Sequence, residues 1–263
     1  MTDQIRLINH SSILIKSGNI KLLTDPWYNG SAFNNGWSLL YENNISEIKK
    51  ILNNLTYIFI SHEHPDHFSI NFFKDYEKII KENKIKIIFQ STQDKRVENF
   101  LSKMNFEIII LEDKQRFELN NNTFVTIFKQ GHIDSALLCE TKDFYHLNIN
   151  DCNFLKKELL KINDFILNKN KKVIIYIQFS YASFRSNDEW LKKAALYKHN
   201  NIVRVYNIFN STMIVPFASF FNFSHSENQH LTKFVNSSLT VSNFLNYNNI
   251  NHCFLNPHLD LID

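Results

Sequence analysis

One stretch of the sequence limits the possible folds more than any other. The apolar run TYIFIS, residues 56–61, is followed at once by HEHPDH, residues 62–67, which holds three histidines and two carboxylates. Such a run is typical of a buried strand, and loops at strand ends are where a rigid scaffold displays functional side chains. The sequence therefore predicts a buried strand that carries a polar cluster to the edge of a sheet.

The spacing inside this cluster suits metal ligation. His62 and His64 lie two residues apart, so in extended backbone both side chains point the same way. Pro65 forces a bend that can aim Asp66 and His67 at a neighbouring point. With 11 histidines in 263 residues, this pattern arises by chance in roughly one chain per thousand. We therefore interpret it as local geometry for two adjacent metals rather than as a polar surface loop.

Two metals need more donors than one loop provides. Imidazole and carboxylate ligands suit zinc, iron, manganese or nickel better than magnesium or calcium. Four polar residues elsewhere also close apolar runs, namely Asp25 after IKLLT, His132 after TFVTIFK, Asp151 after FYHLNI and His225 shortly after TMIVPF. Each could be a turn residue on its own. Together they predict several strands that end at one rim, each supplying a ligand.

The rest of the chain alternates between strand and helix patterns. Further strands are expected at 5–9, 12–16, 20–24, 85–89, 107–111, 116–119, 123–128, 136–140, 144–149, 173–178 and 212–217. Helical spacing appears at 45–55, 97–104, 153–168 and 188–209. This order fits an α/β (α+β) fold with two sheets packed face to face under helices, although composition alone equally allows a generic α+β domain.

Composition narrows the class of partner. The net charge is only +3 and the lysines are scattered, which argues against nucleic acid. The first residues lack a signal-peptide pattern and no run of 18 apolar residues occurs, so we expect a cytoplasmic protein without a membrane span. Three isolated cysteines indicate a reducing compartment. A small-molecule substrate is the expected partner, and the oligomeric state is left open.

The HEHPDH motif resembles the signature of the metallo-β-lactamase superfamily. The resemblance implies a four-layer αββα sandwich over residues 1–263 as a single domain, with a dinuclear metal site at one edge. The implied ligands are His62, His64 and His132 on the first metal, Asp66, His67 and a final histidine on the second, and Asp151 as a bridge. His225 is the expected final histidine, with His230 and His258 as alternatives.

Other stretches are similar to particular branches of that superfamily. NHSSILI (9–15) and LLTDPW (22–27) are similar to the branch that includes ascorbate-6-phosphate lactonases and N-acyl-phosphatidylethanolamine phospholipase D. Residues 22–39, HIDSALL (132–138) and IVPFAS (214–219) are closer to the catalytic domain of CMP-N-acetylneuraminate hydroxylases. Those hydroxylases carry a Rieske domain, whose Cys-x-His and Cys-x-x-His pairs do not occur in these 263 residues.

Two chemistries follow from such a site. In a hydrolase, the metals lower the pKa of a water molecule to about 7, and the hydroxide attacks an ester, lactone, amide or phosphoester of a small, sugar-like or nucleotide-sugar-like substrate. Asp66 and Asp151 are the expected catalytic residues, because Asp66 can orient the hydroxide and Asp151 bridges the metals. Zinc is expected first, with iron or manganese as alternatives. The alternatives are a di-iron oxygenase with a separate redox partner and a non-catalytic binding protein.

Several further residues are candidates for the surroundings of the metals. Asp25 is expected to fix a ligand imidazole, or else to cap the turn before Pro26. Asp134 is expected to face substrate, or else to be a turn residue.

Four more residues are candidates for substrate binding. Tyr181 and Arg185 could bind a phosphate or carboxylate, unless Arg185 is simply solvated. Trp27 and Trp37 could form an aromatic wall for a sugar or base ring, or belong to a loop that covers the core.

Overall fold

The computed structural model describes residues 3–168, 170–181 and 187–257. Within these ranges the strands form two six-stranded sheets and a two-stranded ribbon. The first sheet runs, in spatial order, β1 (Gln4–Asn9), β2 (Ser12–Ser17), β3 (Ile20–Thr24), β5 (Tyr57–Ile60), β6 (Lys86–Gln90) and β7 (Glu107–Leu111). The second runs β13 (Met213–Phe217), β12 (Lys172–Gln178), β11 (Phe144–Asn150), β10 (Asp134–Glu140), β9 (Thr123–Gln130) and β8 (Arg116–Asn120). The ribbon pairs β4 (Trp37–Leu39) with β14 (Phe221–Phe223).

Each large sheet has an antiparallel part and a parallel part. In the first sheet β1 to β3 form an antiparallel meander, whereas β3, β5, β6 and β7 are parallel. In the second sheet β8 to β11 are antiparallel, and β11, β12 and β13 are parallel. Parallel neighbours place their carboxyl ends at one edge, and this edge is where polar loops can gather.

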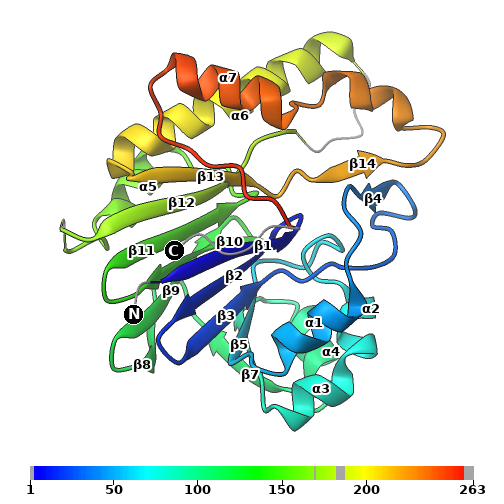
Figure 1. The fold of residues 1–263 in the computed structure, drawn as a ribbon, viewed down its shortest axis with the longest axis vertical. Coiled ribbons are helices and arrows are strands. Elements are labelled where there is room, and N and C mark those ends of the chain that lie inside the picture. The colour runs from blue at the N-terminus through cyan, green and yellow to red at the C-terminus, as the bar shows by residue number, and fades with distance from the viewer. Residues whose placement is uncertain (1–2, 169, 182–186, 258–263) are drawn as a thin grey trace.

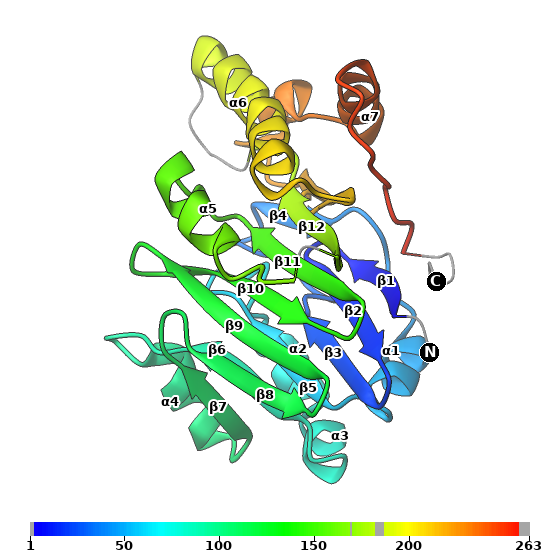
Figure 2. The same cartoon turned by 90° about the vertical axis from the view of Figure 1, so that its left-hand side faces the viewer.

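Helices cover the two outer faces of the stacked sheets (Figures 1 and 2). On the first sheet these are α1 (Ile45–Leu52), α2 (Ile70–Asp75), α3 (Glu77–Glu82) and α4 (Arg96–Lys103). On the second they are α5 (Lys156–Asn163), α6 (Asp188–Phe209) and α7 (Ser238–Tyr247), with a 3₁₀ helix, η1 (Gln229–Phe234), beside α6. Apolar side chains such as Phe59, Ile88 and Ile127 fill the space between the sheets. The expected αββα sandwich is confirmed.

The helix expected at 153–168 is shorter in the structure. It spans Lys156–Asn163, because residues 153–155 are not helical and Leu155 is the N-cap. The Glu158 carboxylate accepts the Leu155 N–H (2.6 Å), a capping contact that defines where the helix begins. The elements α2, α3, β4 and β14 were not expected, because each has six residues or fewer and is too short to show a clear period. Helix α7 was not expected either. Among the described residues no helix is long and apolar enough to cross a membrane.

Candidate metal centre

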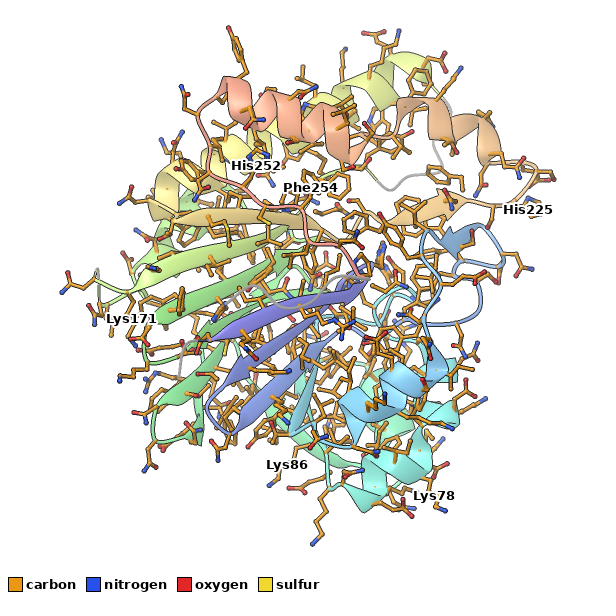
Figure 3. All side chains as sticks on the ribbon, viewed as in Figure 1. Lys78, Lys86, Lys171, His225, His252 and Phe254 are labelled. Carbon is orange, nitrogen blue, oxygen red and sulfur yellow. The ribbon has the colours of Figure 1, made fainter. Side chains whose placement is uncertain are left out.

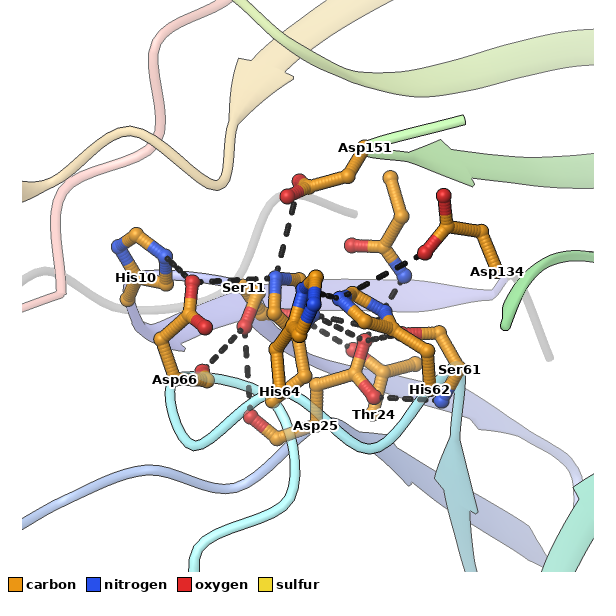
Figure 4. A network of polar contacts seen from close by, with 12 residues as sticks. His10, Ser11, Thr24, Asp25, Ser61, His62, His64, Asp66, Asp134 and Asp151 are labelled. Atoms are coloured by element: carbon orange, nitrogen blue, oxygen red, sulfur yellow. Dashed lines mark hydrogen bonds and ion pairs between the residues drawn. The ribbon is translucent and has the colours of Figure 1, made fainter. Parts of the chain in front are cut away.

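Three loops at the carboxyl ends of strands meet at one edge of the sandwich. Asp25 follows β3, residues 61–67 follow β5, and Asp151 follows β11. Because β3 and β5 are parallel neighbours, their ends lie side by side. The stacking of the second sheet brings the end of β11 to the same place (Figure 4). The ends of β3, β5 and β11 therefore lie close together in the structure, as the sequence pattern predicts.

The first group of donors consists of His62, His64 and Asp134, whose ligand atoms lie within 4.8 Å of one another. Nε2 of His62 lies 2.9 Å from Nδ1 of His64 and 3.9 Å from Oδ1 of Asp134. Asp134 begins β10, and the next residue, Ser135, donates its hydroxyl to the Ser61 carbonyl (2.6 Å). This bond holds the start of β10 against the loop after β5.

The second group consists of His10, Asp66 and His67, and all three are buried. Oδ2 of Asp66 lies 3.3 Å from Nε2 of His10 and 3.4 Å from Nε2 of His67. The group therefore combines two imidazoles with one carboxylate, as the first group does.

Asp151 lies between the two groups. Its Oδ1 atom is 3.6 Å from Nε2 of His67, and Asp151, His62 and His67 form a third set with donor atoms within 4.8 Å. It thus shares one histidine with each of the other groups. This is the place that a carboxylate bridging two ions would take.

Several buried nitrogen and oxygen atoms of the site, which could act as metal ligands, have no hydrogen-bond partner among the described residues. They are Nδ1 and Nε2 of His10, Oδ1 of Asp66, Nε2 of His67 and Oδ1 of Asp151. Each buried polar atom left unpaired costs about 1–3 kcal/mol, and folded proteins rarely gather several in one place. Divalent ions would satisfy the Nε2 and carboxylate atoms, and imidazole with carboxylate is a donor set that such ions accept. The residues present fit a metal centre.

Asp25 fixes the orientation of the surrounding groups from beneath. Its carboxylate is buried and accepts the Ser61 N–H (2.7 Å), the Ser61 hydroxyl (2.9 Å) and the Asn150 side-chain amide (2.8 Å). It also lies 3.2 Å from Nδ1 of His67, and Ser61 Oγ lies 2.9 Å from Nδ1 of His62. With both Nδ1 atoms engaged, the Nε2 atoms of the two histidines are left to face the donor groups.

His10 is the site residue that sequence reasoning missed. It occupies the turn between β1 and β2 with φ 30°, and the Asn9 side chain accepts its N–H (2.8 Å). Its carbonyl accepts the N–H of Ala218, just after β13, so the turn also ties the two sheets together. A signal existed, because His10 closes the apolar run IRLIN in the same way that His132 closes TFVTIFK.

Burial and neighbouring charges shift the pKa values of the site residues in opposite directions. Burial, together with His67, lowers the pKa of His62 to about 3, which keeps that imidazole in the neutral form that binds metals. Burial also acts to lower the pKa of His67, but Asp66 and Asp151 raise it well above its usual value. Burial would raise the pKa of Asp66, yet His67 and His10 hold it well below the usual range. A proton on His67 thus balances the carboxylates, and a bound cation would displace it.

The structure places His132 outside these donor groups. β10 pairs with β9 from Asp134 opposite Gln130, so residues 131–133 form the hairpin turn and His132 is exposed at its tip. Asp134, which we expected to face substrate, lies beside His62 and His64 and also lines the cavity described below. His132 is therefore not among the donor groups that the structure brings together, because the register of the hairpin places it at the tip, and its role as a ligand stays a prediction.

His225 is also outside the donor groups. It is exposed in the loop after β14, and Figure 3 shows it at the outer edge of the molecule. The alternative His230 is exposed in η1, and His258 lies outside the described residues. The place expected for a final histidine, next to Asp66 and His67, is held by His10.

A cavity of about 710 Å³ opens beside the donor groups. His64, Asp134 and Asp151 line it on one side, and Tyr181 lies in its wall. The Tyr181 hydroxyl donates to the Leu231 carbonyl (2.6 Å), which fixes the ring in place.

The other expected substrate contacts differ from the structure. Trp27 and Trp37 are only 1% and 8% exposed, and neither is among the residues that line the cavity. Their rings pack edge-on against His10, with centroid distances of 5.4 and 6.4 Å. In this arrangement they pack around His10, and a role as an aromatic wall for substrate stays a prediction. Arg185 lies outside the described residues.

Comparison with known sequences gives two consistent results. The model of the family described as the beta-lactamase superfamily domain matches residues 4–138, just over half of the chain. The cytidine monophosphate-N-acetylneuraminic acid hydroxylase of Asterias rubens is 26% identical over 244 residues, which cover 87% of this chain and 36% of that protein. The enzyme of Cricetulus griseus is 23% identical over 265 residues, covering 93% and 45%. The chain thus spans less than half the length of these relatives.

Solved structures share the fold at low sequence identity. A possible metal-dependent hydrolase from Veillonella parvula superposes with a TM-score of 0.70 at 15% identity, covering 100% of this chain and 99% of that one. CmlA, a diiron beta-hydroxylase from Streptomyces venezuelae, superposes with a TM-score of 0.63 at 10% identity, covering 96% and 53%. The shared fold therefore occurs in proteins described as hydrolases and in one described as a hydroxylase.

Proposed function

Because the chain belongs to the beta-lactamase superfamily domain family, we propose that it is a dinuclear-metal-dependent hydrolase of a small substrate. Fold neighbours of this kind imply a metal-dependent enzyme that binds divalent ions. The proposed ligands are His62, His64 and Asp134 for one ion, His10, Asp66 and His67 for the other, and Asp151 between them. The substrate is an ester, lactone, amide or phosphoester, with sugar-like and nucleotide-sugar-like molecules as the leading class.

One observation carries this proposal. Buried imidazole and carboxylate atoms without hydrogen-bond partners point at a common centre from the turn after β1, the loop after β5 and the end of β11. No purely structural role accounts for such a set, because each unpaired atom destabilises the fold. A pair of divalent ions accounts for it directly.

Different side chains would have different roles in such a reaction. When bound, the ions would polarise a carbonyl or phosphoryl group and lower the pKa of a water molecule. Asp25 and Ser61 keep the Nε2 atoms of His62 and His67 aimed at the centre. Asp66 lies in the buried group next to His10 and can orient the attacking oxygen. The cavity beside Asp134 and Asp151 offers space for a substrate next to the donor groups.

The test is metal analysis combined with activity. Zinc-loaded protein should hold two ions per chain and hydrolyse at least one of a panel of 4-nitrophenyl esters, lactones and bis(4-nitrophenyl) phosphate. His62→Ala and Asp151→Ala should lose metal and activity together, whereas His225→Ala, a matched exposed histidine, should keep both. Unchanged metal content in both site variants would rule out the proposed centre.

A second candidate is a di-iron hydroxylase that takes electrons from a separate protein. Two observations favour it. The place expected for His132 is taken by Asp134, so the donor set has three carboxylates, and carboxylates favour harder ions than zinc. Two relatives that match most of this chain, those of Asterias rubens and Cricetulus griseus, are described as hydroxylases. Protein purified without added metal, if it holds iron and consumes oxygen when given a chemical reductant, would establish this alternative over hydrolysis.

A further inference from the structure

The cavity beside the metal centre has a second wall, formed by helix α6. Trp190, Tyr197 and Lys198 of this helix line the same cavity as His64 and Asp151. Trp190 and Tyr197 are 38% and 43% exposed, so their rings present apolar surface to whatever occupies the space. A molecule that fills this cavity would therefore contact both the helix and the donor groups.

Lys198 is in an unusual place for a lysine. It lies on the buried face of α6, in register with Leu191, Ile202 and Val205, and is itself only 8% exposed. A charged residue at such a position is rarely buried without a partner. Lys198 nevertheless lines the cavity, and its amine contacts Asn153, another residue of the cavity lining.

The partners of this amine are incomplete. Nζ of Lys198 donates one hydrogen bond, of 3.4 Å, to the side-chain oxygen of Asn153. No described carboxylate lies within ion-pair distance of it, although an ammonium group has three donors. Burial lowers the pKa of Lys198, while the nearby carboxylates of Asp151 and Asp134 act to raise it. A buried cation with one weak neutral partner is costly unless an anion joins it.

We propose that Lys198, with Asn153 beside it, binds a phosphate or carboxylate group of the substrate while Trp190 and Tyr197 contact a ring of the same molecule. The substrate then carries an anionic group at one end and its reacting bond at the other, next to Asp134 and Asp151. Asn153 follows Asp151 by two residues, so the anion site and the metal centre share one segment of chain. The inference rests on the proposed function for what happens at the second end.

The test compares matched charged and neutral ligands by isothermal titration calorimetry. The pairs are AMP with adenosine and glucuronate with glucose, added to zinc-loaded protein. Wild type should bind the anionic member of at least one pair about ten-fold more tightly or better, which is the factor that one charge-assisted hydrogen bond supplies. The two pairs distinguish a phosphate from a carboxylate.

Three variants locate the source of that preference. Lys198→Met keeps the length of the stem, so it should fold, and it should lose the preference while binding the neutral member within about two-fold of wild type. Lys198→Arg should retain it. Lys193→Met, which removes the exposed lysine at the rim (74% exposed side chain), should change it by less than about three-fold. A melting temperature for each variant verifies folding.

The outcomes separate this inference from the proposed function. If wild type shows no anionic preference in either pair, or if Lys198→Met keeps it, the anion site is wrong even when two zinc ions are bound. If wild type binds no zinc, the proposed function is wrong. A Lys198-dependent preference measured on metal-free protein would then still support the anion site.

Discussion

Replacing Asp25 by asparagine removes one charge from a residue that touches no solvent. Asp25 is 0% exposed and holds φ 38°, a backbone region that asparagine also accepts, so the change leaves the chain path intact. One carboxylate oxygen accepts from the Ser61 hydroxyl, the Asn150 amide and Nδ1 of His67, and the other accepts the Ser61 N–H at 2.7 Å. Every hydrogen-bonding group that contacts the Asp25 carboxylate thus acts as a donor to it.

The magnitude follows from this geometry. Asparagine has a single oxygen, which can keep the three donors on one side. Its NH₂ group must then face the Ser61 N–H, donor against donor. Losing a hydrogen bond to a charged acceptor and leaving a buried donor unpaired should lower the free energy of unfolding by about 2–4 kcal/mol. Because His67 loses a charged partner for its Nδ1–H, metal affinity should also fall by about 10–100-fold.

Two measurements check these effects. Urea denaturation in the presence of EDTA gives the free energy of unfolding of the metal-free protein. Competition with a chromophoric zinc chelator gives the affinity for zinc. Asp75→Asn is the matched control, because Asp75 is exposed and accepts from Asn29 alone (2.6 Å); its change should stay within about 0.5 kcal/mol. If Asp25→Asn binds zinc as tightly as wild type and unfolds at the same urea concentration, Asp25 does not orient the ligands.

Three further predictions concern the hairpin tip, the core and pH. His132→Ala should leave metal content and activity unchanged, and loss of one ion would restore His132 as a ligand. Phe59→Ala, at a fully buried position between the sheets, should cost about 3–5 kcal/mol in urea denaturation, and Phe59→Leu clearly less; equal small losses would contradict the packing. Burial would raise the pKa of Asp3, but hydrogen bonds from His146 and Thr141 lower it below 3.8. The stabilisation that the ionised Asp3 carboxylate provides is therefore fully present above its ordinary pKa of 3.8. This stabilisation is lost as pH falls through the lowered pKa of the folded protein. Asp3→Asn should destabilise by about 1–2 kcal/mol at pH 6 and by less at pH 3, and an equal effect at both would contradict it.

The strands and the motif after β5 could be predicted from the sequence because their signals are local. The run 56–61 matches β5 (Tyr57–Ile60), and the long helix expected at 188–209 matches α6. Both are set by apolar periodicity within one element, which a sequence displays directly. The layered αββα arrangement needed the family resemblance, because periodicity does not say which sheet packs on which.

Two of the candidate metal ligands, Asp134 and His10, could not be predicted from the sequence. Which residues reach the site there depends on how segments far apart in the chain pair with one another. His132 and Asp134 are two residues apart, and only the pairing of Asp134 with Gln130 shows which of them leaves the turn. His10 meets Asp66 across 56 positions of sequence, through a turn whose place depends on Ala218 at the end of the other sheet. A rule that any polar residue closing an apolar strand is a candidate donor would have included His10, but it would not have excluded His132 or His225.

The measurement that tests the central claim most directly is the metal stoichiometry of two histidine variants beside wild type. Protein loaded with zinc and passed through a desalting column would be analysed by mass spectrometry for ions per chain. The account predicts two ions for wild type, one for His10→Ala and two for His225→Ala, because His10 belongs to the buried group with Asp66 and His67. Two ions in His10→Ala, or the loss of one in His225→Ala, would contradict it.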